Sequence, residues 1–236
     1  MIQVKNCKGQ NKASGFEGCG RQVHVFKRKF GLCPSCLYDW MTETTEGLKY
    51  KEKQFLPKVS KNLKHTKQKE KTQAKRELMS VDKYRAKVLQ PVINEIARLI
   101  DYDCPCIATG NYNGKMAGGH YHSVGSNRTL ALNLHNIHIQ SFHSNSWKGG
   151  DDKRYQEGLK EVYSNSYFEF VESLKGQSAL HLTKPDLVAI YKKSLKVRAE
   201  LKRGLEYREP RQRIFLRNLV NKRLGIYDEQ FKTFKL

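Results

Sequence analysis

The fold of this chain is set by residues 101–150, which read DYDCPCIATG NYNGKMAGGH YHSVGSNRTL ALNLHNIHIQ SFHSNSWKGG. Glycine, asparagine, histidine and serine are frequent here, and the apolar residues do not follow a helical spacing. Segments of this kind are more often loops and short strands that carry a functional site than packing elements. We therefore predict a site-bearing segment without long helices.

Helices are predicted on both sides of this segment. Upstream, apolar residues recur at four-residue steps, as on one face of a helix: Val88, Val92, Ile96 and Ile100. Pro91 lies within the pattern and either kinks the helix or places its start near Gln90. Downstream, helical spacing returns after Asp151, and residues 183–186 (TKPD) have the cap and the proline of a helix start.

Three motifs within the central segment carry a resemblance when they are taken together. They are GGHYHS at 118–123, NIH at 136–138, and Asn145 followed by Lys148 and Gly149. Their order and spacing resemble the NinG/Rap family of phage recombination proteins, over residues 82 to about 200. That family is similar to HNH endonucleases, in which a ββα-metal finger carries the chemistry.

The resemblance implies a role for each motif residue. His120 would be the general base that removes a proton from the attacking water, work to which a near-neutral imidazole is suited. Asn136 would stabilise the loop and orient His120. Asn145 would give its carbonyl oxygen to a catalytic Mg²⁺ or Mn²⁺, since these ions prefer oxygen ligands. Arg128 and Lys148 would contact phosphate, or else remain solvated cations.

Two departures from the family pattern are visible. The pattern has two CxxC pairs that hold a second structural zinc, but residues 106–109 read CIAT and residues 141–144 read SFHS. We therefore expect no second zinc, and apolar or hydrogen-bonded packing in its place, with Ile107, Leu132, Ile137 and Phe142 in the core. In addition, many HNH enzymes have an acidic metal ligand directly before the histidine, where this chain has Gly119.

A separate metal site is predicted near the start of the chain. A CxxC knuckle at 33–36 presents two thiolates, and two earlier cysteines supply two more; the four are Cys7, Cys19, Cys33 and Cys36. Tetrahedral zinc takes four such ligands at about 2.3 Å. A segment this short and this poor in apolar residues would gain its fold from the metal. Buried or redox-active cysteines are the alternative interpretation.

The charge of the chain indicates a polyanionic partner. Lys and Arg number 44 against 23 Asp and Glu, a formal net charge of +21, and such an excess favours nucleic acid as the partner. A basic helix is predicted from Lys61 to Leu78, and it would contact the DNA backbone. The expected contact residues are Lys64, Lys67, Lys71, Lys75 and Arg76. No apolar run approaches a membrane span and no secretory signal is visible, so we expect a cytoplasmic protein of a bacterial or phage-infected cell.

These features predict an α+β chain in four parts. Residues 1–41 form a zinc-ribbon-like module, 42–80 a basic helical linker, 81–204 the HNH-like nuclease domain with flanking helices, and 205–236 a basic amphipathic tail in a helical C-terminal region. The leading hypothesis is a structure-selective endonuclease acting on branched double-stranded DNA, such as Holliday junctions and displacement loops. Paired incisions would favour a homodimer. The alternatives are a nuclease-dead DNA-binding scaffold and a sequence-specific HNH nuclease of the homing or restriction type.

Overall fold

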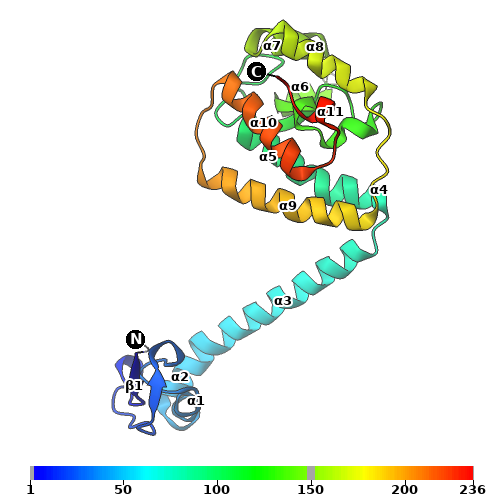
Figure 1. Ribbon diagram of the computed structural model, residues 1–236. Helices are drawn as coiled ribbons and strands as arrows, with labels where there is room; N and C mark the ends of the chain where they lie inside the picture. The colour runs from blue at the N-terminus through cyan, green and yellow to red at the C-terminus, as the bar shows by residue number, and fades with distance from the viewer. Residues whose placement is uncertain (1–2, 148–151, 236) are drawn as a thin grey trace. The chain divides into compact units, whose positions relative to one another are not determined.

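The computed structural model describes residues 3–147 and 152–235, and it divides the chain into two compact units, 1–77 and 78–236 (Figure 1). The fold is rich in helix, with two small antiparallel sheets of two strands each. None of the helices in the described part of the chain combines the length and the apolar character needed to cross a lipid bilayer. Each unit is described by itself.

The first unit is a short hairpin followed by helices. Its elements are β1 (Val4–Asn6), β2 (Gln22–His24), α1 (Pro34–Glu43), α2 (Thr45–Tyr50), a π-helical turn (Lys51–Phe55) and α3 (Leu56–Glu77). Its core is a small aromatic cluster in which the rings of Phe30, Trp40 and Tyr50 lie 5.2–5.6 Å apart. The predicted basic helix is α3, and it begins earlier than the sequence indicated. It buries no side chain along its 22 residues.

The second unit is built on a hairpin packed against helices. Its elements are α4 (Val81–Tyr84), a π-helical turn (Arg85–Leu89), α5 (Gln90–Ile100), β3 (Met116–His120), β4 (Ile137–Ser141), α6 (Phe142–Trp147), α7 (Asp152–Val162), α8 (Asn165–Ser173), α9 (Lys184–Arg203), α10 (Pro210–Leu224) and α11 (Glu229–Lys232). Helical backbone runs from Val81 to Ile100 without a break, so the helix does not start near Gln90. Pro91 lies just after the π-helical turn in its middle. Thr183 caps α9 as predicted.

Helix α5 lies at the centre of this unit. Its apolar face packs on the β3–β4 hairpin and on α9, and Ile93, Ile96 and Ile100 are fully buried. In Figure 1, α7 and α8 lie at the end of the unit opposite α9. They enclose a second apolar cluster with Ile107 and Leu130. The hairpin is therefore held firmly, which fixes the position of His120 at the end of β3.

Of the four side chains expected in the core of the hairpin region, three are buried. Ile107, Leu132 and Ile137 are at most 6% exposed, which confirms their placement. The placement of Phe142 was wrong, because its side chain is 52% exposed at the start of α6. Phe142 comes directly after the last residue of β4, so the alternation of side chains along the strand no longer applies to it.

Candidate metal and hydrolytic sites

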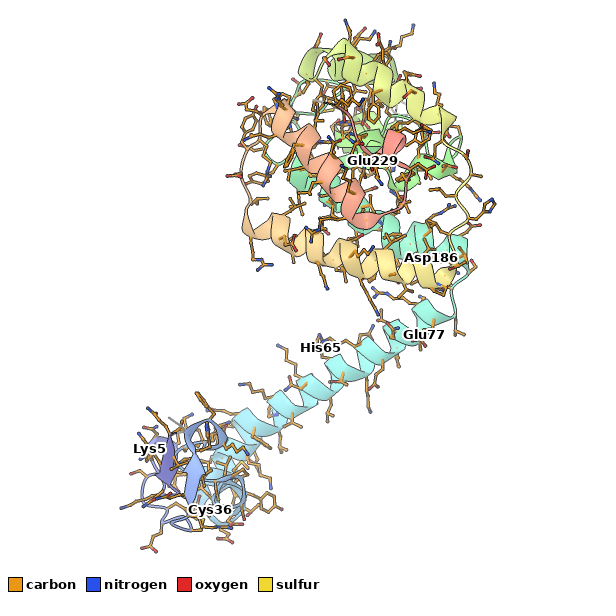
Figure 2. The ribbon with its side chains drawn as sticks, viewed as in Figure 1. Lys5, Cys36, His65, Glu77, Asp186 and Glu229 are labelled. Carbon is orange, nitrogen blue, oxygen red and sulfur yellow. The ribbon has the colours of Figure 1, made fainter. Side chains whose placement is uncertain are left out.

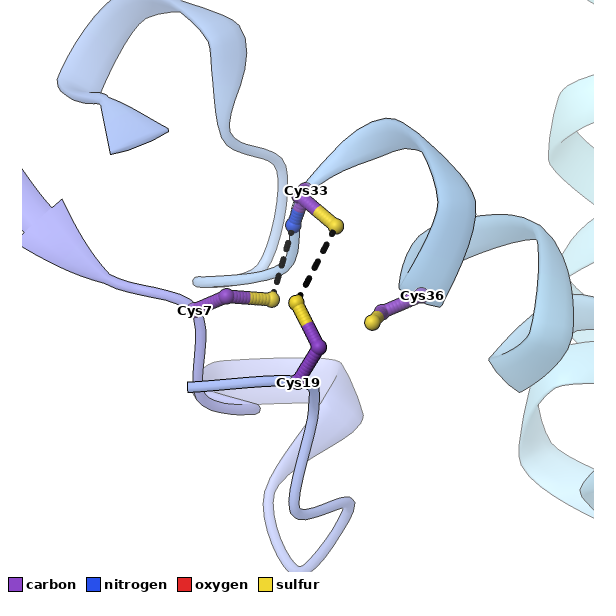
Figure 3. Close-up of side chains that lie close together, drawn as sticks. All are labelled: Cys7, Cys19, Cys33 and Cys36. Atoms are coloured by element: carbon purple, nitrogen blue, oxygen red, sulfur yellow. Dashed lines mark hydrogen bonds between the residues drawn. The ribbon is translucent and has the colours of Figure 1, made fainter. Parts of the chain in front are cut away.

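The four N-terminal cysteines converge at one point (Figure 3). All four sulfurs lie within 4.8 Å of one another, and the Sγ atoms of Cys19 and Cys33 are 3.8 Å apart. That separation matches the edge of a zinc tetrahedron with bonds of about 2.3 Å. Chain segments far apart in sequence supply the ligands: Cys7 follows β1, Cys19 lies in the loop before β2, and the CxxC pair lies at the start of α1.

Polar contacts around the sulfurs suit thiolate. The backbone N–H of Cys33 donates to Cys7 Sγ at 3.1 Å, and Arg21 Nε donates to Cys19 Sγ at 3.3 Å. The bond from Arg21 lowers the pKa of Cys19 to about 6, whereas burial and the neighbouring thiols raise the pKa of Cys36 to about 12. Because a metal ion takes thiolates, the donor set fits zinc. The four residues form a candidate zinc site.

The second site is centred on His120, the last residue of β3. Its ring Nε2 lies 3.1 Å from the carbonyl oxygen of Ala131, in the loop between β3 and β4. The amide nitrogen of Gln90 also lies 3.1 Å from His120 Nε2. However, two nearer oxygens, Asn94 Oδ1 at 2.7 Å and the Ala131 carbonyl at 2.5 Å, accept its two hydrogens. Because a carbonyl only accepts, the Ala131 contact then favours the proton on His120 Nε2 and leaves the lone pair on Nδ1. Among the described residues, no group forms a hydrogen bond with Nδ1. Burial lowers the pKa of His120, and the Ala131 bond offsets this only in part.

Asn136 closes the loop that follows His120. Its side-chain Oδ1 accepts from the backbone N–H of His122 at 2.8 Å, while its Nδ2 donates to the carbonyl of His122 at 3.0 Å and to that of Leu130 at 3.3 Å. Asn136 is fully buried, and its own carbonyl accepts from Tyr121 N. The carboxamide therefore fixes both ends of the loop that carries Ala131.

His120 and Asn136 lie at the same end of the β3–β4 hairpin, and Asn145 lies in α6, which follows β4. His120 pairs with Ile137, next to Asn136, whereas Ser141 at the other end of β4 pairs with Met116. Strand β4 thus ends four residues, or about 13 Å, from the residue that pairs with His120, and α6 begins directly after it. Asn145 is half-buried in α6, which packs on both strands. It forms no hydrogen bond with His120 or Asn136 in the described part of the chain.

The glycines before His120 are explained by packing. A Cβ atom at Gly118 would lie 2.8 Å from the backbone oxygen of Asn94, and one at Gly119 would lie 1.9 Å from Gln140 Oε1. Contacts of this length do not occur without a shift of the neighbour. An acidic ligand at position 119 would therefore collide with Gln140, which occupies the space beside the backbone there.

The positions of the degenerate CxxC pairs are neighbours joined by hydrogen bonds. Cys106 Sγ lies 3.9 Å from Ser144 Oγ, and Ser141 Oγ accepts from the backbone N–H of Ser144 at 3.2 Å. Burial opposes ionisation of Cys106, but bonds from Thr109 and from the Ser141 backbone outweigh it and lower its pKa. Hydrogen-bonded packing thus joins the two segments, the kind of packing expected there.

The remaining predicted contact residues lie on the surface or outside the described residues. Arg128 has 69% of its side chain exposed, and its guanidinium lies 3.7 Å from Asp82. Lys148 lies outside the described residues. In α3 the side chains of Lys64, Lys67, Lys71 and Lys75 are exposed, and Arg76 is half-buried. Figure 2 shows the side chains of α3 projecting on all sides of the helix, with His65 labelled among them.

Two further histidines of the motifs, His122 and His138, are packing residues. His138 is fully buried, with its ring nitrogens 3.1 Å from Tyr155 Oη and 3.3 Å from Tyr167 Oη. His122 is 6% exposed, and its Nε2 lies 2.9 Å from the carbonyl of Val171. These contacts satisfy both side chains inside the protein and remove them from the candidate site.

Sequence reasoning missed three residues that support the hairpin. The hydroxyl of Tyr155 on α7 donates to the carbonyl of Gly119 and accepts from His138 N, both at 3.0 Å. Arg217 on α10 is fully buried and contacts both carboxylate oxygens of Asp101, at 2.8 and 2.7 Å. Asp101 in turn accepts from Ile139 N in β4 at 2.9 Å. The helical spacing of Tyr155 with Leu159 was the one available signal; a buried arginine in a basic tail gives none.

The family of the chain follows from its sequence pattern. The family described as Bacteriophage Lambda NinG protein matches residues 7–206, from the first cysteine of the candidate zinc site to beyond α9. The chain belongs to the NinG family of phage recombination-associated proteins. No curated protein and no solved structure matches it.

Proposed function

We propose that this chain is a metal-dependent endonuclease that hydrolyses phosphodiester bonds in branched DNA recombination intermediates. The observation that carries the proposal is the state of His120. Its Nε2 is held by the Ala131 carbonyl, its Nδ1 is open, and its pKa is lowered, so the ring is a neutral base at neutral pH. The branched substrate is taken from the NinG family and its link to recombination.

The reaction assigns one task to each of the two hairpin residues. Nδ1 of His120 takes a proton from water as the water oxygen bonds to phosphorus, and the bond from phosphorus to the 3′ oxygen breaks; the proton then passes to solvent and the leaving oxygen is protonated by water. Asn136 keeps the Ala131 carbonyl in place, which fixes the tautomer of His120. Mg²⁺ or Mn²⁺ held by the Asn145 carboxamide and by water would neutralise charge on the scissile phosphate.

DNA binding would come from the positive charge of the chain, and above all from α3. This helix carries eight basic side chains against two acidic ones. Lys64, Lys67, Lys71 and Lys75 follow one face at steps of three and four residues, so they form one stripe. Since α3 buries no side chain, it lacks the packing from which helices in proteins gain most of their stability, and contact with phosphates would also stabilise it. The zinc site would fold the module before it.

A nuclease-dead DNA-binding scaffold is the second candidate, and one observation favours it. Gln140 fills the space that an acidic metal ligand at position 119 would need. Asn145 would therefore hold a metal ion weakly. A scaffold of this kind would bind branched DNA through α3 and would not cut it.

The test is incubation of the purified protein with Mg²⁺ or Mn²⁺ and labelled four-way, forked and linear duplex DNA. Cleavage confined to the branched substrates is expected. Cutting of a linear duplex at one sequence would instead assign the homing or restriction type. Binding of branched DNA with no cleavage in either metal would assign the scaffold.

A further inference from the structure

A cavity of about 640 Å³ in the second unit has no part in the proposed reaction. It lies between the 101–112 segment, β4, α7 and the start of α10. Its volume falls within the range of about 300–1,000 Å³ that small-molecule sites occupy. The close approach that forms one wall requires glycine, because a Cβ at Gly158 would lie 1.8 Å from the carbonyl oxygen of Ile107.

The cavity is lined by a buried guanidinium that lacks a full set of partners. Arg213 is 5% exposed, and its Nε has no hydrogen-bond partner. Its nearest carboxylate is that of Asp101, at 3.8 Å, which already pairs with Arg217. Its guanidinium carbon lies 4.9 Å from the centre of the Tyr163 ring. A buried donor without an acceptor destabilises the fold, and an acceptor supplied by a ligand would remove that cost.

The charges that line the cavity exclude a phosphate as that ligand. Glu157 and Glu161 lie one turn apart on α7, and Glu209 lies at the start of α10, so carboxylates outnumber guanidiniums there although the chain carries +21. Arg154 lines the cavity as well as Arg213, so a phosphate would be repelled by the carboxylates and a cationic group by the two guanidiniums. A neutral group with both acceptors and donors suits the set, and Tyr112, Tyr163 and Tyr207 add aromatic surface for stacking.

We propose that this cavity binds an unpaired guanine base. Guanine offers O6 and N7 as acceptors to an arginine, and its N1–H and N2–H₂ groups are donors for a glutamate. Forked DNA and displacement loops expose unpaired bases at the point where the strands separate. The inference thus rests on the DNA partner of the proposed function and specifies what the protein would read at a branch.

The experiment measures binding by the full-length protein, without added Mg²⁺ or Mn²⁺, to forked DNA with one unpaired nucleotide at the branch. Guanine should bind at least about fivefold more tightly than adenine, cytosine or thymine. The double variant Glu157→Gln/Glu161→Gln, which changes exposed side chains and spares the fold, should lose this preference and keep the affinity for the adenine fork. Glu169→Gln, an exposed change on α8 outside the cavity, should keep it.

A second arm distinguishes a base within DNA from a free nucleoside. Deoxyguanosine, titrated alone and in competition with deoxyadenosine, should bind selectively through the same two glutamates. Equal affinity for all four forks together with no selective binding of deoxyguanosine would overturn the proposal. Because no cleavage is measured, a guanine preference in a protein that does not cut would keep this inference and refute the nuclease.

Discussion

The two units of this chain reach their folded states by different means. In the first, the buried cluster is small and includes three of the four cysteines, so a metal ion would join chain segments that few apolar contacts hold. In the second, α5 and the hairpin bury a large apolar core, and polar side chains are buried beside it and bonded to one another. The comparison teaches that removal of the metal should unfold the first unit, whereas low pH should destabilise the second.

Loss of the metal should have the largest effect, and it should be confined to the first unit. Structural zinc contributes about 10–16 kcal/mol at pH 7, more than a small module has to lose. Chelation, or Cys33→Ser, should therefore abolish amide protection in residues 3–55 and leave the second unit protected, as measured by hydrogen exchange. Metal analysis should find one zinc per chain; two would refute the interpretation of the degenerate pairs.

Asp101→Asn should be the most damaging single change in the second unit. It leaves the fully buried Arg217 without a counter-charge, and loss of one partner of a buried pair costs about 3–5 kcal/mol. Burial works against the Arg217 charge, and the Asp101 carboxylate restores it by raising the Arg217 pKa. The loss of stability is measured as the decrease in the urea concentration at which the second unit is half unfolded.

Glu95→Gln is the matched control for this change. Glu95 pairs with Arg198 and Lys202 at the surface, where such pairs contribute at most about 1 kcal/mol. An equal loss from the two variants would show that the buried pair is not special.

Acid should weaken the second unit through its buried histidines. Burial lowers the pKa of His135 to about 3 and that of His138 well below its usual value. Below about pH 6.5 the unfolded chain takes up protons that the folded chain does not, so stability falls as the pH falls. At pH 5 the loss is about 2 kcal/mol for each histidine. Denaturation of the zinc-loaded protein at pH 7 and pH 5 measures it; no loss would mean that these rings are protonated in the fold.

Neutralising the lysine stripe of α3 should have the smallest effect on the stability of the protein, but it should weaken the binding of DNA. Lys64→Gln/Lys67→Gln/Lys71→Gln should leave the stability of both units unchanged, because all three side chains are exposed. It should lower DNA affinity and reduce the slope of log affinity against log salt by about 2.7. Lys192→Gln/Lys193→Gln/Lys196→Gln, exposed changes on α9, should alter the slope much less. Equal changes would assign binding to net charge alone.

The sequence predicted those features that depend on local spacing. The four cysteines, the helix face of Val92 and Ile96, and the cap at Thr183 all follow from residues close together in the chain. Contacts between residues that are far apart in the sequence could not be predicted from local spacing. Asp101 and Arg217 are 116 residues apart, and nothing in the basic tail shows that one arginine is buried.

The same distinction between local and distant features applies to the candidate site at His120. The motif residues His120 and Asn136 are joined through the loop between them, and their order in the sequence predicted that they would act together. The Ala131 carbonyl that fixes the His120 tautomer is a backbone group in a loop, and side-chain patterns carry no information about it. The same holds for Gln140, whose packing against Gly119 appears only when the strands are paired.

The most direct test of the account is the rate at which His120→Ala cleaves a four-way junction in Mg²⁺ or Mn²⁺. The account predicts a loss of about 10²-fold or more, with junction binding unchanged, and no loss in His181→Ala, which removes an exposed histidine of the same unit. In the wild type, the loss of cleavage toward acid pH should set in at a lower pH than the ordinary histidine pKa would give, because burial lowers the pKa of His120. Undiminished cleavage by His120→Ala would contradict the account.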